Sequence, residues 1–291
     1  MKLSIITINY NNVEGLRKTI ASVAAQTYRD IEHIIVDAAS IDGSVDIIKD
    51  YARACRYPVV WSSEPDGGVY AGMNKGIKKA TGEYIYILNS GDKLAGPEVT
   101  ARMIAALNDG MSRDKSLNDG GMDILIGNIV QVYADGKRKV ERRESRVKGQ
   151  EPQPIESSML TFYKGTIPQD AAFVRRELFE KYGYFDEKMK ICADWKLYLN
   201  MITLGGVQPW YVDIDVVQFD MSGISNTNNE LRLAERRAYL EEVLPASVLK
   251  DYDDHAFDIE QMNRLRERHL YRLVYFIERV LFKLEKWGIL R

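Results

Sequence analysis

The 291-residue chain is predicted to be an α/β protein, because three features recur along its first hundred residues. Short apolar runs alternate with segments of helical periodicity, in the strand–helix–strand order of a doubly wound sheet. The apolar runs are continuous, as expected for mostly parallel strands that helices cover on both faces. A polar segment follows each run, at the edge where such sheets bind ligands.

The pattern gives strands over residues 3–10, 31–36, 59–61 and 84–88, and helices over 13–26, 44–54 and 73–79. In the first helix, Leu16, Ile20 and Val23 recur at the spacing of one buried face. The later elements are expected to be a loop over 108–121, a strand over 123–132, an exposed hairpin or loop over 137–148, and helices over 173–181, 193–204 and from 229 to the end with a break near Pro245.

Composition excludes several classes of protein. A formal charge of −2 gives no general attraction to nucleic acid, so no nucleic-acid partner is expected. Two cysteines cannot form a disulfide framework. No run reaches the roughly 20 apolar residues of a membrane-spanning helix, and the start lacks a cleavable signal. A cytoplasmic location is expected, with membrane contact only at a surface.

Four polar segments follow the expected strands, at 7–11, 37–42, 63–68 and 89–92. Because the carboxyl ends of parallel strands lie at one edge of the sheet, these segments are predicted to form one site. No Gly-x-Gly-x-x-Gly follows the first strand, and no Gly-x-x-x-x-Gly-Lys-Ser/Thr occurs. Their absence argues against a dinucleotide-binding enzyme and a P-loop NTPase.

Two carboxylates in these segments, Asp92 and Asp37, each have two interpretations. Asp92 ends the turn 89–92 and could bind Mg²⁺ or Mn²⁺ bridging two phosphates, since hard cations prefer oxygen; a plain surface turn is the alternative. Asp37 could accept hydrogen bonds from a nucleotide or serve a β-to-α turn. Asn74 and Lys75 are placed at a helix start, where they could address phosphate.

Eight short motifs, in order, resemble family-2 glycosyltransferases. They are Ser-Ile-Ile-Thr-Ile-Asn-Tyr-Asn (4–11), Ser-Val-Ala-Ala-Gln-Thr-Tyr (22–28), Ile-Ile-Val-Asp-Ala-Ala-Ser (34–40), Asp-Gly-Ser (42–44), Ser-Glu-Pro-Asp (63–66), Met-Asn-Lys-Gly (73–76), Ala-Thr-Gly-Glu-Tyr (80–84) and Leu-Asn-Ser-Gly-Asp (88–92). The resemblance is dense over the first hundred residues and thinner to about 205. It implies a GT-A fold, in which a Rossmann-like nucleotide-sugar-binding half over 1–105 joins an acceptor-binding half over 106–225. Residues 226–291 would form a C-terminal helical extension.

The resemblance also implies site residues. Those expected to bind the nucleotide sugar are Thr7, Asn9, Tyr10, Asp37, Asp66, Asn74, Ser90, Gln169 and Asp170. Asp37 would reach the base, and Asn74 would lie near the diphosphate. Ser90 replaces the first acid of the family's Asp-x-Asp motif, which leaves Asp92 as the carboxylate ligand for Mn²⁺ or Mg²⁺.

On the acceptor side, the resemblance implies that Asp194 is the catalytic base. A carboxylate suits this role because the attacking hydroxyl loses a proton as the sugar carbon becomes oxocarbenium-like. Ala193 replaces the preceding acid of the family, and Gln169 and Asp170 stand where relatives carry His-Gln. A first-turn Asp that stabilises a helix is the alternative for Asp194.

The expected function is inverting transfer of a sugar from a nucleotide-diphosphate donor to a saccharide or lipid-linked saccharide, in cell-surface polysaccharide biosynthesis. A degenerate binding or assembly domain is one alternative, motivated by Ser90 and Ala193. A sugar-phosphate nucleotidyltransferase is another, but it should carry a glycine- and arginine-rich loop where residues 7–12 read Thr-Ile-Asn-Tyr-Asn-Asn.

Residues 261–287 form one amphipathic, basic helical pattern. Such a face could pack on the catalytic domain, form a homodimer, or lie on an anionic membrane at the inner face, where a lipid-linked acceptor would be found. Packing or dimerisation is favoured over membrane contact, because amphipathicity mainly signals burial.

Overall fold

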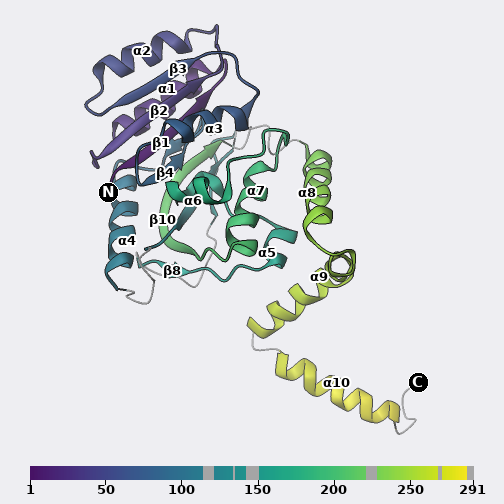
Figure 1. The fold of residues 1–291 in the computed structure, drawn as a ribbon. Helices are drawn as coiled ribbons and strands as arrows, with labels where there is room; N and C mark the ends of the chain where they lie inside the picture. The colour runs from purple at the N-terminus through teal and green to yellow at the C-terminus, as the bar shows by residue number, and fades with distance from the viewer. Residues whose placement is uncertain (114–120, 134, 142–150, 221–227, 268–270, 287–291) are drawn as a thin grey trace. The chain divides into compact units, whose positions relative to one another are not determined.

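The computed structural model (Figure 1) describes residues 1–113, 121–133, 135–141, 151–220, 228–267 and 271–286. Two compact units divide the chain, one over 1–237 and one over 238–291. The boundary expected between 225 and 226 falls within residues 221–227, which lie outside the described residues, so it stays a prediction.

The first unit is built on a mixed sheet with the strand order β3-β2-β1-β4-β9-β6-β10-β5, which confirms the expected fold class. Strands β1 (Leu3–Asn9), β2 (Ile31–Asp37), β3 (Val59–Ser63) and β4 (Tyr84–Ile87) are parallel to one another. Strand β9 (Ala172–Arg175) is antiparallel to both neighbours, and β6 (Ile124–Val132) is parallel to β10 (Pro209–Asp220). Three short strands extend this half of the sheet: β5 (Lys93–Leu94) and β8 (Gln153–Pro154) pair with β10, and β7 (Arg138–Glu141) pairs with β6.

Helices cover both faces of the parallel half, as the strand register shows. Ile35 of β2 packs with Leu16 of α1 (Val13–Ala24) and Ile48 of α2 (Ser44–Ala54). Neighbouring residues along a strand point to opposite faces, so Ile6, which is paired with Ile34, faces the other side. There α3 (Val69–Lys79) approaches β1 so closely that a Cβ at Gly76 would lie 2.4 Å from Ile6. A glycine is required at that contact.

The remaining described helices of the first unit are α4 (Val99–Arg113), α5 (Met159–Lys164), α6 (Arg176–Tyr182) and α7 (Ala193–Tyr198), which continues as a π-helix over Leu199–Leu204. A 3₁₀ turn, η1, spans Gln169–Ala171. Helix α8 (Asn229–Val243) begins in the first unit and ends in the second. The second unit also contains α9 (Ala246–Glu267) and α10 (Tyr271–Lys286).

Several expected elements need correction. Helix α3 begins at Val69 rather than near 73, because Gly68 makes the turn with φ +116° and donates to Asp66. Helix α4 extends to Arg113, where a loop from 108 was expected; its buried Ile104 and Leu107 hold it in place. The rest of that loop, 114–120, lies outside the described residues, as does 142–150 of the expected hairpin.

Three further differences concern strands. Residues 173–175, expected to be helical, belong to β9, because pairing with β4 and β6 overrides their local preference. Gln153–Pro154 pairs as β8 although the prolines were expected to interrupt any element. Strand β10 is not among the expected strands. The described part of the amphipathic pattern expected over 261–287 lies in α9 and α10, and residues 268–270 and 287 lie outside the described residues.

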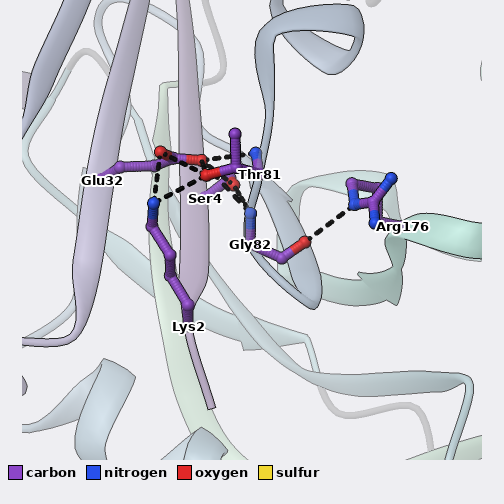
Figure 2. A network of polar contacts seen from close by, with 6 residues as sticks. All are labelled: Lys2, Ser4, Glu32, Thr81, Gly82 and Arg176. Carbon is purple, nitrogen blue, oxygen red and sulfur yellow. Dashed lines mark hydrogen bonds and ion pairs between the residues drawn. The ribbon is translucent and has the colours of Figure 1, made fainter.

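A network of polar contacts ties the amino ends of β1 and β2 to the loop before β4 (Figure 2). The buried Glu32 carboxylate accepts hydrogen bonds from Ser4 Oγ at 2.6 Å and Thr81 N at 2.7 Å, and lies 2.8 Å from Lys2 Nζ. Burial by itself raises the pKa of Glu32, but these partners outweigh it and lower the pKa to about 2. The ionised form is therefore part of the native structure.

Candidate active site

A cleft of about 900 Å³ opens beyond the carboxyl ends of β1 and β4, within the first unit. It receives residues from all four polar strand ends that the sequence singles out, and from three segments of the second half. The lining residues are Ile8–Tyr10, Asn12, Ala38, Pro65–Tyr70, Met73, Asn89–Asp92, Gln169, Asp170, Lys190, Ile191, Asp194 and Phe219. The expected convergence of strand ends is confirmed.

The cleft unites most of the expected site residues. Those that line it are Asn9, Tyr10, Asp66, Ser90, Asp92, Gln169, Asp170 and Asp194. Among the described residues, Thr7, Asp37 and Asn74 are not part of the lining. All three side chains are buried and form hydrogen bonds with other groups of the protein.

Thr7 belongs to a buried hydrogen-bond chain behind the cleft. Its hydroxyl donates to Leu88 O at 2.8 Å and lies 2.9 Å from His33 Nε2. Since the hydroxyl proton is used, His33 must carry its proton on Nε2, and its Nδ1 accepts from Tyr51, 2.8 Å away. Burial lowers the pKa of His33 to about 3, which keeps the ring neutral. Thr7 therefore supports the turn that follows Leu88.

Asp37 is fully buried and fixes two loops. Its Oδ1 accepts from Asn9 Nδ2 at 2.8 Å and Ser40 Oγ at 2.6 Å, and its Oδ2 accepts from Ser63 Oγ at 2.6 Å. Burial raises the pKa of Asp37, but the hydrogen bonds from Ser40, Ser63 and Asn9 bring it below its usual value. The carboxylate thus orients Asn9, which does line the cleft.

Asn74 joins the two halves of the unit rather than standing at a helix start. Its Nδ2 donates to Phe185 O and Glu187 Oε1, each at 2.9 Å, and its Oδ1 accepts from Phe185 N at 3.0 Å. Lys75 pairs with Glu64 at 3.1 Å. The helix begins five residues before Asn74, so neither side chain is at its N-terminus.

The turn 89–92 presents oxygen atoms to the cleft. Gly91 has φ +113°, Asp92 is 6% exposed, and Ser90 Oγ donates to Asn9 Oδ1 at 2.7 Å. Asn89 Oδ1 is buried without a hydrogen-bond partner. A carboxylate and an unpartnered amide oxygen in one turn are ligand types that Mg²⁺ and Mn²⁺ accept. Within the described ranges, no three His, Cys, Asp or Glu residues gather as an all-protein metal site.

Asp170 and Asp194 face the same cleft from η1 and from the first turn of α7. Burial, and next the Asp194 charge, raise the pKa of Asp170 to about 7. Burial also raises the pKa of Asp194, against hydrogen bonds from the Trp195 backbone and Tyr70 and the positive charge of Arg236. A raised carboxyl pKa produces a stronger base near neutral pH.

Three lining residues that can serve binding or catalysis were not among the expected site residues. Tyr70 places its hydroxyl 2.6 Å from Ile191 O and 3.3 Å from Asp194 Oδ1, so it orients the carboxylate. Lys190 brings a cation to the lining, and Asn89 brings the unpartnered oxygen. Asn89 belongs to a motif that the sequence highlights, but Tyr70 and Lys190 have no local signal, since their roles depend on α3 and the loop before α7 meeting.

Comparison with known proteins agrees with this geometry. Residues 4–183 match the family described as Glycosyl transferase family 2. The chain belongs to this family. It is therefore a glycosyltransferase, and its mixed α/β architecture is the GT-A fold that the sequence motifs imply.

Relatives of this family-2 glycosyltransferase include an uncharacterized glycosyltransferase of Mycobacterium tuberculosis, 34% identical over 227 residues, or 77% of each chain. A PGL/p-HBAD biosynthesis glycosyltransferase of Mycobacterium bovis is 25% identical over 77% of this chain and 79% of the relative.

Two solved structures share the fold. TarS 1–349 of S. aureus, in complex with UDP, has a TM-score of 0.55 at 20% identity; the match covers 76% of this chain and 60% of that one. A mannosyltransferase of Pyrobaculum calidifontis, in complex with GDP-Man and Mn²⁺, has a TM-score of 0.50 at 18% identity, over 74% and 55%. No described helix of the present chain combines the length and hydropathy needed to cross a membrane.

Proposed function

We propose that this glycosyltransferase moves a sugar from a nucleotide-diphosphate donor to a hydroxyl acceptor with inversion, using the 1–105 half for the donor and the 106–225 half for the acceptor. The observation that carries the proposal is that one cleft contains both candidate cation ligands and a candidate general base. The buried Asp92 and the unpartnered Asn89 Oδ1 lie on its donor side, and the Asp194 carboxyl with its raised pKa lies on the other.

On the donor side, Asp92 and Asn89 would hold a divalent cation, Mn²⁺ or Mg²⁺. When bound, this ion supplies positive charge that stabilises the leaving diphosphate. Gln169 Nε2 is buried without a hydrogen-bond partner, which leaves a neutral donor for a phosphate oxygen. Tyr10 is 67% exposed at the lining and offers an aromatic face to the nucleoside. Asp37 acts through Asn9, and Asp66 closes the edge next to α3.

On the acceptor side, Asp194 accepts the proton of the attacking hydroxyl. The hydroxyl oxygen bonds to the anomeric carbon while that carbon's bond to the diphosphate breaks, and a single displacement inverts the configuration. Tyr70 holds the carboxylate in place at 3.3 Å. The Asp170 carboxyl, with a pKa of about 7, is partly protonated near neutrality and so adds less negative charge beside the donor.

The acceptor we propose is a saccharide or lipid-linked saccharide of cell-surface polysaccharide or glycolipid assembly. Support comes from the Mycobacterium bovis relative, whose name places it in PGL/p-HBAD biosynthesis. Helix α10 exposes apolar side chains, among them Leu273 (55%), Phe276 (65%) and Ile277 (48%). Such a face suits a second subunit first, and an anionic membrane surface at the inner face second.

The test is a thermal-shift panel with UDP-glucose, UDP-N-acetylglucosamine, GDP-mannose and dTDP-rhamnose, with and without Mn²⁺. A donor that binds only the native state raises the melting temperature by mass action. We expect a Mn²⁺-dependent shift with one nucleotide, lost in Asp92→Ala, and release of its diphosphate when octyl glucoside is the acceptor. Binding without turnover would favour a degenerate binding domain, and no shift with any donor would overturn the proposal.

A further inference from the structure

The loop that precedes Asp194 is held by a carboxylate from α8, a helix that the sequence assigns to the C-terminal extension. Glu235 accepts hydrogen bonds from three successive backbone amides: Lys190 N at 2.6 Å, Ile191 N at 3.0 Å and Cys192 N at 3.0 Å. Lys190 and Ile191 line the cleft, and Asp194 lies two residues after Cys192. Amide bonds to an ionised acceptor are stronger than neutral ones, so this contact fixes the loop firmly.

The same loop is anchored to α3 on its other side. Asn74 binds the loop at Phe185 and Glu187, and the Tyr70 hydroxyl lies 2.6 Å from Ile191 O. Near Ile191, therefore, α8 holds the backbone N–H groups while α3 holds a carbonyl. Removing either side leaves the other anchor in place, so the loop can loosen without unfolding of the sheet.

Helix α8 also reaches the residues on either side of Asp194. The Arg236 guanidinium lies 5.2 Å from the Trp195 ring centroid, and the Cys192 thiol donates to Arg232 O at 3.5 Å. Trp195 in turn donates from its indole to Phe162 O at 2.8 Å and is 1% exposed. The start of α8 and the start of α7 thus form one packed structure inside the first unit.

We infer that Glu235 is a positioning residue for transfer, which sets the loop 190–192 so that Asp194 and Lys190 face the cleft in the geometry required for reaction. The inference rests on the proposed role of Asp194 as the base. It makes the first turns of α8 part of the catalytic unit rather than of an appendage. A displacement of about 1 Å at a reacting group costs on the order of 100-fold in rate, so loss of this anchor should act on kcat.

Cys192 provides a readout that does not depend on turnover. Its side chain is 2% exposed, and burial raises the pKa of its thiol to about 11. In the full-length Cys55→Ser background it is the only cysteine. The Glu235 charge also raises the pKa of this thiol, so the rate of modification by a thiol reagent is measured across pH and corrected to the thiolate form. The corrected rate reports opening of the loop. Glu235→Ala removes the anchor, and Glu235→Gln retains one oxygen acceptor without the charge. Glu242→Ala, at an exposed position on the same helix, is the matched control.

We expect Cys192 to react about 10-fold faster in Glu235→Ala than in the parent, with Glu235→Gln intermediate and Glu242→Ala unchanged. Diphosphate release from the panel donors with octyl glucoside should show kcat reduced about 10- to 100-fold in Glu235→Ala, a smaller loss in Glu235→Gln, and donor KM within about twofold. If Glu235→Ala does not fold, the inference is tested by comparing the Cys192 modification rate and kcat of Glu235→Gln with those of Glu242→Ala.

Unchanged Cys192 reactivity together with unchanged kcat would overturn the inference. So would a loss of kcat accompanied by an equal loss of donor-induced thermal stabilisation, since that result indicates general unfolding. Failure of the proposed function looks different: Asp194→Asn would retain turnover, or no donor would bind, while the Cys192 rates would still report the anchor.

Discussion

At the amino ends of β1 and β2, Glu32 is surrounded by donors, whereas Asp170 and Asp194 in the cleft beyond the carboxyl ends have few. The pKa of Glu32 falls to about 2, and that of Asp170 rises to about 7. Burial raises the carboxyl pKa in both regions; the difference is that Lys2, Ser4 and Thr81 offset it for Glu32. The Glu32 carboxylate therefore stabilises the fold, whereas the Asp170 and Asp194 carboxyls in the cleft reduce its stability.

The two regions have opposite pH dependence. Glu32 has a folded pKa below its ordinary value, so its stabilisation is present above pH ~4.5 and is lost as the pH falls toward 2. Asp170 has a folded pKa above its ordinary value, so the native state binds its proton more tightly and stability falls as the pH rises from ~4 to 7. Substitutions in the two regions should separate stability from activity.

The largest effect is expected at Asp194. Asp194→Asn removes the proposed base, and we expect transfer to fall about 10³-fold, within the range for general bases. Because the buried carboxyl has a raised pKa, its neutral replacement should leave the melting temperature at pH 7 equal or higher. Donor-dependent diphosphate release and calorimetry measure the two quantities. A lower melting temperature together with full activity would show that Asp194 serves stability rather than catalysis.

Asp92→Ala is expected to have the next largest effect. Loss of the carboxylate should lower transfer about 100-fold at fixed Mn²⁺ and remove the Mn²⁺ dependence of donor binding, since Asn89 Oδ1 alone is a neutral ligand. Titration of Mn²⁺ in the thermal-shift panel measures this. Glu242→Ala, at an exposed position that is not part of the lining, serves as the control. Equal Mn²⁺ dependence in the wild type and Asp92→Ala would place the cation elsewhere.

Glu32→Gln tests the stabilising region. The change removes an ion pair and charge-assisted hydrogen bonds, so we expect a loss of about 2 kcal/mol in the free energy of unfolding at pH 7. The difference from wild type should shrink as the pH falls below ~4.5. Urea titrations at pH 7 and pH 4 measure it. Transfer measured well below the melting temperature should be unchanged, and a selective loss of kcat would contradict the division between the two regions.

The smallest effects are expected for Asp170→Asn. Since Asp194 raises the pKa of Asp170, removal of the Asp170 charge should lower the pKa of Asp194 in return. The acidic limb of the kcat–pH profile should move to lower pH by roughly half to one unit. The free energy of unfolding at pH 8 should rise by about 1 kcal/mol. Rate–pH profiles and melting curves at pH 5 and 8 test this. A limb that moves to higher pH would contradict the coupling.

Local sequence patterns predicted the order of strands and helices in the first hundred residues. Strand β1 and helix α2 lie where periodicity placed them, because an alternating or 3.6-residue pattern depends only on near neighbours. The polar strand ends predicted the cleft, since parallel strands must end at one edge. The four-residue β9 and the start of α3 were mispredicted, because pairing across the sheet and the turn at Gly68 decide them.

The sequence by itself determined the family, the donor-side motifs and the types of residue available for chemistry. Only the tertiary structure decided which side chains face the cleft: Asp37 and Asn74 turn to protein partners, whereas Tyr70 and Asn89 enter the lining. Glu235 meets residues 43 to 45 positions earlier in the chain, and Asn74 meets Phe185 across 111. Such contacts depend on how whole elements pack, and no local pattern records them.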